Sequence, residues 1–229
     1  MQTIHLKGNG QIREGRTEID VPHLDTLKTF IYPLNGPGYH SALMQRIDEQ
    51  ELIRPTTAQV LSLVDLAQYN SDEPHCKNIL KIFKDDYLWT ATESLSFPEG
   101  VIVYDNIDGK MPTSRSALLE LANSKDARVR LVEPGFKIGW MPIKDALENS
   151  YTIAQIGEEM LPVFERIAKR LDDKKAFVAG LSGTKVDAKR YTAVIDSDGW
   201  LYLGGDFRGD GRGGYASGVI PTDEASREK

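Results

Sequence analysis

The sequence has only one cysteine, Cys76, among its 229 residues. A disulfide within the chain and a zinc site built from several cysteines are therefore excluded, and the composition is compatible with a reducing compartment. No apolar run approaches the roughly 20 residues that a membrane-spanning helix needs. The first residues also lack the basic and apolar regions of a secretory signal. We therefore expect a cytoplasmic protein with no membrane segment.

An excess of basic residues is lacking too. Lys and Arg together number 28, Asp and Glu number 34, and the formal net charge is -6. A chain with net negative charge repels phosphate groups, so the composition argues against a nucleic acid partner. Hydrophobic residues make up 40% of the sequence, which is enough for one large core. We predict a single domain over residues 1–229.

The residue patterns of common catalytic and cofactor sites are missing as well. His75 and Cys76 are adjacent, but no third residue stands at the spacing of a zinc site or a catalytic triad. Residues 180–185 contain glycines and a lysine without the spacing of a phosphate-binding loop. A calcium loop that began at Asp196 would need an acid where Phe207 stands. The sequence thus predicts no catalytic residue, no cofactor and no metal site.

Several segments repeat apolar residues at the spacing of amphipathic helices. The expected helices cover residues 24–30, 39–50, 56–67, 77–83, 116–122, 142–148 and 153–171. The helix at 56–67 has the clearest start, since Thr56 and Gln59 match the N-cap and N3 positions of a capping box. Pro162 should kink or split the last helix, because proline removes an amide donor and clashes with the preceding turn.

Alternating polar and apolar residues between turn formers indicate strands. We expect one hairpin within residues 1–21, and a second hairpin, the strongest such signal, whose turn lies at residues 196–199. The arms of the second hairpin and the remaining strands cover residues 87–91, 101–104, 128–132, 191–195, 200–203 and 215–220. The C-terminal portion is therefore rich in strands. Within it, residues 204–214 predict a flexible loop and residues 222–229 a disordered tail.

The order of two motifs resembles the Lcl-type C-terminal domain family, which occurs at the end of collagen-like proteins and in many bacterial and phage proteins. In that family a Leu-Pro-Thr helix start precedes a Tyr-Trp-(Ser/Thr)-Ser-Thr-Glu strand. The match covers about residues 50–105 of this chain. The corresponding residues are Ile53, Arg54, Pro55 and Thr56, followed by Leu88, Trp89, Thr90, Ala91, Thr92 and Glu93.

The resemblance implies a C-type-lectin-like fold of the α+β class, in which residues 113–173 form an inserted helical segment. It also implies a rigid platform whose loops bind proteins or glycans. The calcium-dependent sugar motifs of true lectins, Glu-Pro-Asn and Trp-Asn-Asp, are absent from the sequence. We therefore expect a binding or structural module that is not an enzyme, and whose specificity the sequence does not give.

Arginine and aromatic residues near the C-terminus have the composition favoured at recognition surfaces. The predicted binding residues are Trp200, Tyr202, Phe207, Arg208, Arg212 and Tyr215. Two alternatives remain open on sequence grounds. The first is a hydrolase that uses carboxylates such as Glu93 and Asp105 as acid and base. The second is a structural component of a phage or another assembly, for which a homo-oligomer would be the expected state.

Overall fold

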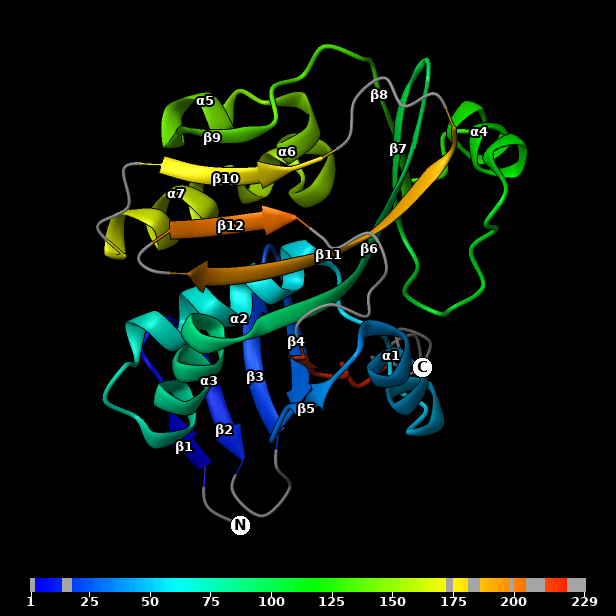
Figure 1. Cartoon of the computed structure of the whole chain (residues 1–229). Coiled ribbons are helices and arrows are strands. Elements are labelled where there is room, and N and C mark those ends of the chain that lie inside the picture. Colours follow the sequence, from blue (N-terminus) through cyan, green and yellow to red (C-terminus); the bar gives the residue numbers. More distant parts are fainter. Residues whose placement is uncertain are drawn as a thin grey trace.

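The computed structural model describes residues 3–13, 18–171, 175–180, 186–197, 200–204 and 213–221 (Figure 1). The strands are β1 (Thr3–His5), β2 (Gln11–Arg13), β3 (Glu18–His23), β4 (Thr26–Ile31), β5 (Asn35–Gly38), β6 (Tyr87–Phe97), β7 (Gly100–Asp105), β8 (Val129–Val132), β9 (Gly139–Pro142), β10 (Lys175–Ala179), β11 (Ala188–Ser197), β12 (Trp200–Gly204) and β13 (Gly214–Ala216). The helices are α1 (His40–Glu49), α2 (Thr57–Tyr69), α3 (Pro74–Asp85), α4 (Arg115–Asn123), α5 (Ile143–Leu147), α6 (Ser150–Ile156) and α7 (Leu161–Arg170), with a short 3-10 helix η1 (Glu158–Met160).

The strands form two sheets. Strands β1 to β4 make a four-stranded antiparallel sheet in chain order, which includes the hairpin expected within residues 1–21. The other sheet has nine strands, of which β5, β13, β6, β11, β12, β10 and β9 are neighbours in that order, while β7 pairs with β6 and β8 with β7. In Figure 1, α7 and α2 lie behind β12 and β11, and α1 lies in front near β5.

One apolar cluster joins the two sheets. It contains Ile19 and Phe30 of the small sheet, Leu61 of α2, and Val194 and Leu203 of the large sheet, each 0% or 1% exposed. Burying one such side chain stabilises the fold by about 1.5–3 kcal/mol. Because side chains of a strand alternate between its faces, this packing also fixes which residues point away from the helices.

The start of α2 confirms the predicted capping box. Gln59 N donates to Thr56 Oγ1 at 3.3 Å, and Thr56 N donates to Gln59 Oε1 at 3.0 Å. Beside this cap, Thr57 N donates to Thr92 Oγ1 of β6 at 3.0 Å. The first turn of α2 is therefore tied to the large sheet through the two segments that carry the family resemblance.

The helix expected over residues 24–30 is wrong, since Thr26–Ile31 forms strand β4. Leu24 has a φ of 50° in the turn that follows β3, and β4 then pairs with β3 along its whole length. Leu24 and Leu27 are 56% and 44% exposed, so the apolar spacing that predicted a helix does not mark a buried face. Pairing with a neighbouring strand outweighs local periodicity in this segment.

Residues 153–171 form two helices, and the break does not occur at Pro162. Helix α6 ends at Ile156, and Gly157 follows with a φ of 83°, a left-handed conformation that glycine adopts without strain. Helix α7 begins at Leu161. Pro162 therefore lies in the first turn of α7, where its missing amide donor has no helical partner to lose.

Strands β9 and β10 were not among the strands expected from the sequence, and both contribute aromatic residues to the surface of the large sheet. The expected second hairpin is confirmed, because β11 and β12 pair antiparallel.

Two segments with sequence predictions lie outside the described residues. They are residues 205–212, which make up most of the glycine-rich segment, and the tail 222–229. That residues 113–173 are an insertion stays a prediction. Among the helices that the structure describes, none is both long and apolar enough to cross a membrane.

The small sheet contains a fully buried carboxylate, Asp20. Arg13 Nε donates to Asp20 Oδ2 at 3.1 Å, Thr29 Oγ1 donates to Asp20 Oδ1 at 2.7 Å, and Gln11 donates a further hydrogen bond. Burial alone would raise the pKa of Asp20, but the hydrogen bonds from Arg13, Gln11 and Thr29 outweigh burial and lower the pKa below its ordinary value of 3.8. The ionised carboxylate therefore stabilises the small sheet at neutral pH.

We predict that Asp20→Asn lowers the free energy of unfolding by about 2 kcal/mol at pH 7, because hydrogen bonds to a charged acceptor are lost. Since folding lowers the pKa of Asp20, its contribution is complete above pH 3.8 and disappears as the pH falls through the lower pKa of the folded protein. Urea unfolding of both proteins between pH 7 and pH 2 checks this. A stability difference that stays constant over this range would contradict it.

Candidate functional site

The β9 end of the large sheet has two faces of different chemistry. On β10 and β12 the residues that face the helices are aliphatic and buried, such as Val178 and Leu203. The residues between them are aromatic and point to the other side, which in the described part of the chain has no helix over β9, β10 and β12 (Figure 1). The residues of this surface, called the aromatic face below, are Trp140 of β9, Phe177 of β10, and Trp200 and Tyr202 of β12.

Strand register places three of these rings in one row. Trp140 pairs with Phe177 between β9 and β10, and Phe177 pairs with Tyr202 between β10 and β12. The centroids of Trp140 and Phe177 are 4.9 Å apart with the rings inclined at 66°, and those of Phe177 and Tyr202 are 4.9 Å apart and nearly parallel, at 7°. Such pairs add about 0.5–1.5 kcal/mol to the energy of apolar burial, so the rings hold one another in place.

The outer end of the row is open to solvent. Trp140 is 55% exposed and Trp200 is 37% exposed, although their ring centroids are only 4.9 Å apart. Trp89, by contrast, is 1% exposed. Single exposed apolar residues are common on protein surfaces, but a contiguous group of large exposed rings is a candidate interaction site.

The aromatic rings continue toward the centre of the sheet, where α1 covers them. Tyr202 lies 6.4 Å from Tyr87 between ring centroids, and Tyr87 lies 5.2 Å from Trp89. Trp89 packs in an apolar cluster with Leu43 and Ile47 of α1. Helix α1 therefore buries the inner part of this side of the sheet but does not extend over the aromatic face at the β9 end.

The structure brings together two of the six predicted binding residues, Trp200 and Tyr202. Tyr215 lies elsewhere, because it pairs with Leu88 of β6 and packs against the main apolar cluster on the opposite side of the sheet. The other three predicted residues, Phe207, Arg208 and Arg212, fall outside the described part of the chain.

Sequence reasoning missed Trp140 and Phe177. The run Ala176, Phe177, Val178 has an apolar residue at each position, so the outward direction of Phe177 cannot be read from it. Trp140 stands in a four-residue strand that ends at Pro142. Such a short strand shows no periodicity, and only its pairing with β10 reveals the position of Trp140.

The carboxylates of the alternative hydrolase do not form a pair. Asp105 lies opposite Thr92 in the β6–β7 register, and Glu93 lies opposite Tyr104. Because neighbouring residues of a strand point to opposite faces, Glu93 and Asp105 are on opposite sides of the sheet. Asp105 accepts hydrogen bonds from Thr92 Oγ1 and from Arg130 Nη1, both at 2.7 Å. The geometry therefore gives no acid and base acting on one substrate atom.

Glu93 belongs to a buried ion pair. Its side chain is 3% exposed, and Lys189 Nζ lies 2.6 Å from Glu93 Oε2. Asn106 Nδ2 donates to Glu93 Oε1 at 3.3 Å. The pKa of the neighbouring Tyr104 hydroxyl is raised, mainly because the hydroxyl is buried and secondly because of the negative charge of Glu93. These contacts make Glu93 a structural charge that depends on its lysine.

We predict that Lys189→Met lowers the free energy of unfolding at pH 7 by about 3 kcal/mol, because it leaves Glu93 buried without a counter-charge. Chemical unfolding of both proteins at pH 7 measures the loss. Lys175→Met, which removes an exposed lysine, is the matched control, and equal losses in the two variants would refute the role of the ion pair.

Cys76 lies at the start of α3 and is 1% exposed. Burial, and then the charge of Glu73, raise the pKa of its thiol to about 12. Glu73 Oε2 also accepts a hydrogen bond from Cys76 N at 2.9 Å and so caps the helix. A nucleophilic cysteine needs a lowered pKa and access to substrate, and Cys76 has neither. No group of three or more His, Cys, Asp or Glu residues within the described ranges could hold a metal ion.

We predict that the thiol of Cys76 reacts with Ellman's reagent at pH 8 on the order of 1000-fold more slowly in the native protein than in 6 M guanidinium, because burial suppresses the thiolate. Stopped-flow absorbance under both conditions measures the ratio. Similar rates would show that the thiol is accessible in the folded chain.

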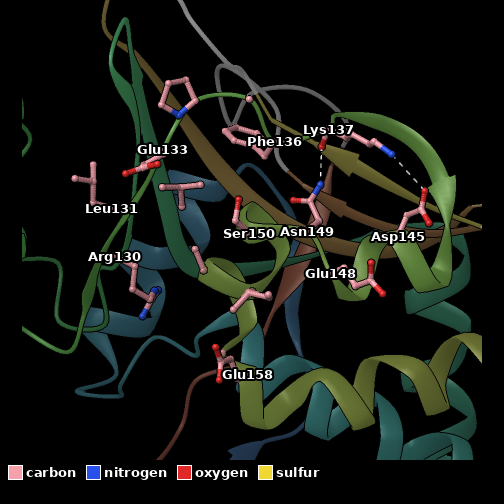
Figure 2. A pocket seen from close by; sticks show the side chains of 16 residues that line it. Arg130, Leu131, Glu133, Phe136, Lys137, Asp145, Glu148, Asn149, Ser150 and Glu158 are labelled. Atoms are coloured by element: carbon pink, nitrogen blue, oxygen red, sulfur yellow. Dashed lines mark hydrogen bonds and ion pairs between the residues drawn. The ribbon is translucent and has the colours of Figure 1, made fainter.

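A separate pocket of about 900 Å³ lies between α6 and the segment that joins β8 to β9 (Figure 2). Asn149 holds its walls together: Asn149 Nδ2 donates to Lys137 O at 2.8 Å, and Asn149 Oδ1 accepts from Tyr151 N at 3.0 Å at the start of α6. Phe136 stacks on Tyr151 with ring centroids 4.8 Å apart. The pocket is therefore formed by the fold itself.

Comparison with known proteins gives one informative match. No family model and no curated protein sequence matches the chain. A solved structure described as "Accommodation of massive sequence variation in Nanoarchaeota by the C-type lectin fold" is similar over 87% of this chain and 99% of its own, with a TM-score of 0.54 and 15% sequence identity. The resemblance to the Lcl-type family itself stays a prediction. At this identity the match shows the fold alone, and this α+β chain has the C-type lectin fold.

Proposed function

We propose that this protein is a non-enzymatic binding module that recognises a protein partner through its aromatic face. The observation that carries the proposal is the row Trp140, Phe177 and Tyr202, together with the exposed Trp200, on a side of the sheet where no helix of the described chain covers β9, β10 and β12. Tryptophan and tyrosine are enriched among the residues that contribute most to binding energy in protein interfaces. The core of such interfaces is rich in aromatic side chains, as this surface is.

The shape of the surface favours a protein over a glycan. A sheet face is broad and shallow, whereas small ligands and single sugars are usually held in concave pockets. The structural neighbour is described as a C-type lectin fold that accommodates massive sequence variation, which supports the use of this fold as a platform whose surface residues set specificity.

The segment 205–212 belongs to the proposal on sequence grounds. It leaves the described structure after Gly204, which ends β12, and it returns at Gly213, next to β13. Trp200 and Tyr202 thus precede it directly in the chain. Arg208 and Arg212 would supply the charged contacts that commonly surround an aromatic interface core.

We predict that peptides selected from a phage-displayed library on the wild-type protein lose about thirtyfold in affinity for Trp140→Ala, because truncating a central tryptophan typically costs about 2 kcal/mol or more. Phe177→Ala should also weaken binding, since it removes the support of the Trp140 ring. Titration of fluorescently labelled peptides measures the affinities. Tyr39→Ala is the matched control. Tyr39 immediately precedes α1 in the chain and is 53% exposed, so this variant should bind the peptides with wild-type affinity.

Peptides that bind wild-type protein and Trp140→Ala equally would contradict the proposed site. Binding to a glycan array that disappears in Trp140→Ala would keep the site and replace the partner by a glycan. Sedimentation of the free protein tests the alternative that the protein is a component of an assembly. Self-association that is lost in Trp140→Ala would identify the aromatic face as an assembly contact.

A further inference from the structure

The pocket between α6 and the segment 133–138 is lined in part by apolar side chains. They include Val132, Phe136, Ile153 and Ala154. Its volume of about 900 Å³ falls within the range of small-molecule sites, which is roughly 300–1,000 Å³. The pocket lies on the side of the large sheet that α2 and α7 cover, because Tyr151 of α6 contacts Ser94 of β6 on that side. It is therefore separate from the aromatic face.

The charged residues around the opening are unequally paired. Lys137 Nζ lies 3.6 Å from Asp145, and Arg130 Nη1 lies 2.7 Å from Asp105, so both basic residues of the lining have a carboxylate partner. The three glutamates have no ion pair within the described ranges. Figure 2 shows them on three sides of the opening, each from a different segment: Glu133 after β8, Glu148 between α5 and α6, and Glu158 in η1.

The walls are held in place before any ligand arrives. Asn149, which is 7% exposed, fixes the carbonyl of Lys137 and the first amides of α6 at once. Behind the wall, Gly180 approaches so closely that a Cβ there would lie 3.0 Å from both Phe136 and Tyr151. A rigid pocket loses little entropy when a ligand binds, which favours affinity even for a small molecule.

From these observations we propose that the pocket binds an organic cation, an ammonium or guanidinium group on an apolar stem. The stem would contact the apolar side chains of Ile153 and Ala154, and the cation would lie near the carboxylates of Glu133, Glu148 and Glu158, which have no ion pair with any other described residue. A free amine and the side chain of a basic peptide share this chemistry.

Isothermal titration of the full chain with 2-phenylethylamine, 2-phenylethanol and 3-phenylpropionate tests the charge preference. The three compounds share the same apolar phenyl group and differ in the charge of their polar end. The amine should bind with a Kd on the order of 1 mM, as its size allows, and the alcohol and the acid should bind at least about tenfold more weakly. Binding of the amine should weaken as salt is added, because exposed carboxylates are screened. Equal binding of amine and alcohol, or no binding of the amine, overturns the proposal.

Variants locate the binding to the pocket. Glu148→Gln and Glu158→Gln should each weaken amine binding about two- to fivefold, the effect expected of an exposed charge pair. Ser150→Phe should block the opening and abolish it, with an unchanged thermal transition to show that the chain is folded. Glu120→Gln, an exposed site on α4, is the matched control. Unchanged amine binding in all three pocket variants would overturn the assignment.

Two further titrations distinguish the source of the cation. Nα-acetyl-lysine-N-methylamide presents the amine as a peptide side chain, and agmatine presents a free guanidinium and amine. Tighter binding of the lysine derivative than of agmatine supports a basic peptide as the ligand, and the reverse supports a free metabolite.

The Trp140→Ala variant separates this proposal from the proposed function. Because the substitution leaves the pocket intact, this variant should bind amine normally even if its aromatic face recognises no partner, so the two proposals can fail independently.

Discussion

The long central strand β6 is the element on which the other features depend. It pairs with β13, β11 and β7, and each of its residues after Tyr87, from Leu88 to Phe97, is buried. A strand buried on both sides must satisfy the polar groups on each of them. On the helix side, Thr92 bonds to the start of α2 and Ser94 bonds to Tyr151 of α6. On the other side, Glu93 forms an ion pair with Lys189. These contacts fix the positions of the helices, and through them the position of the pocket.

The alternation of side chains along the strands then gives the large sheet two different surfaces. Toward the helices it presents aliphatic residues, and this packing determines that Trp140, Phe177 and Tyr202 point the other way. The same alternation separates Glu93 from Asp105. One geometric rule thus separates the two carboxylates of the hydrolase hypothesis and creates an aromatic surface.

The two proposed sites use opposite sides of the sheet and different chemistry. The aromatic face is broad, aromatic and held by ring-to-ring contacts, whereas the pocket is smaller, bordered by carboxylates and held by Asn149. Neither requires a metal or a covalent step. A fold that serves as a rigid support can carry independent sites of this kind, because each depends on its own local contacts.

The sequence by itself determined the elements whose signals are local. These elements are the capping box of Thr56 and Gln59, the hairpin of β11 and β12, and the motif at residues 88–93 that suggested the fold. The sequence also indicated Trp200 and Tyr202 as surface candidates. Only the tertiary structure decided that residues 26–31 form a strand, that Trp140 and Phe177 join Tyr202, and that Tyr215 does not. These outcomes depend on which strands become neighbours and on which side the helices pack. Such contacts join residues far apart in the chain, so no local pattern records them.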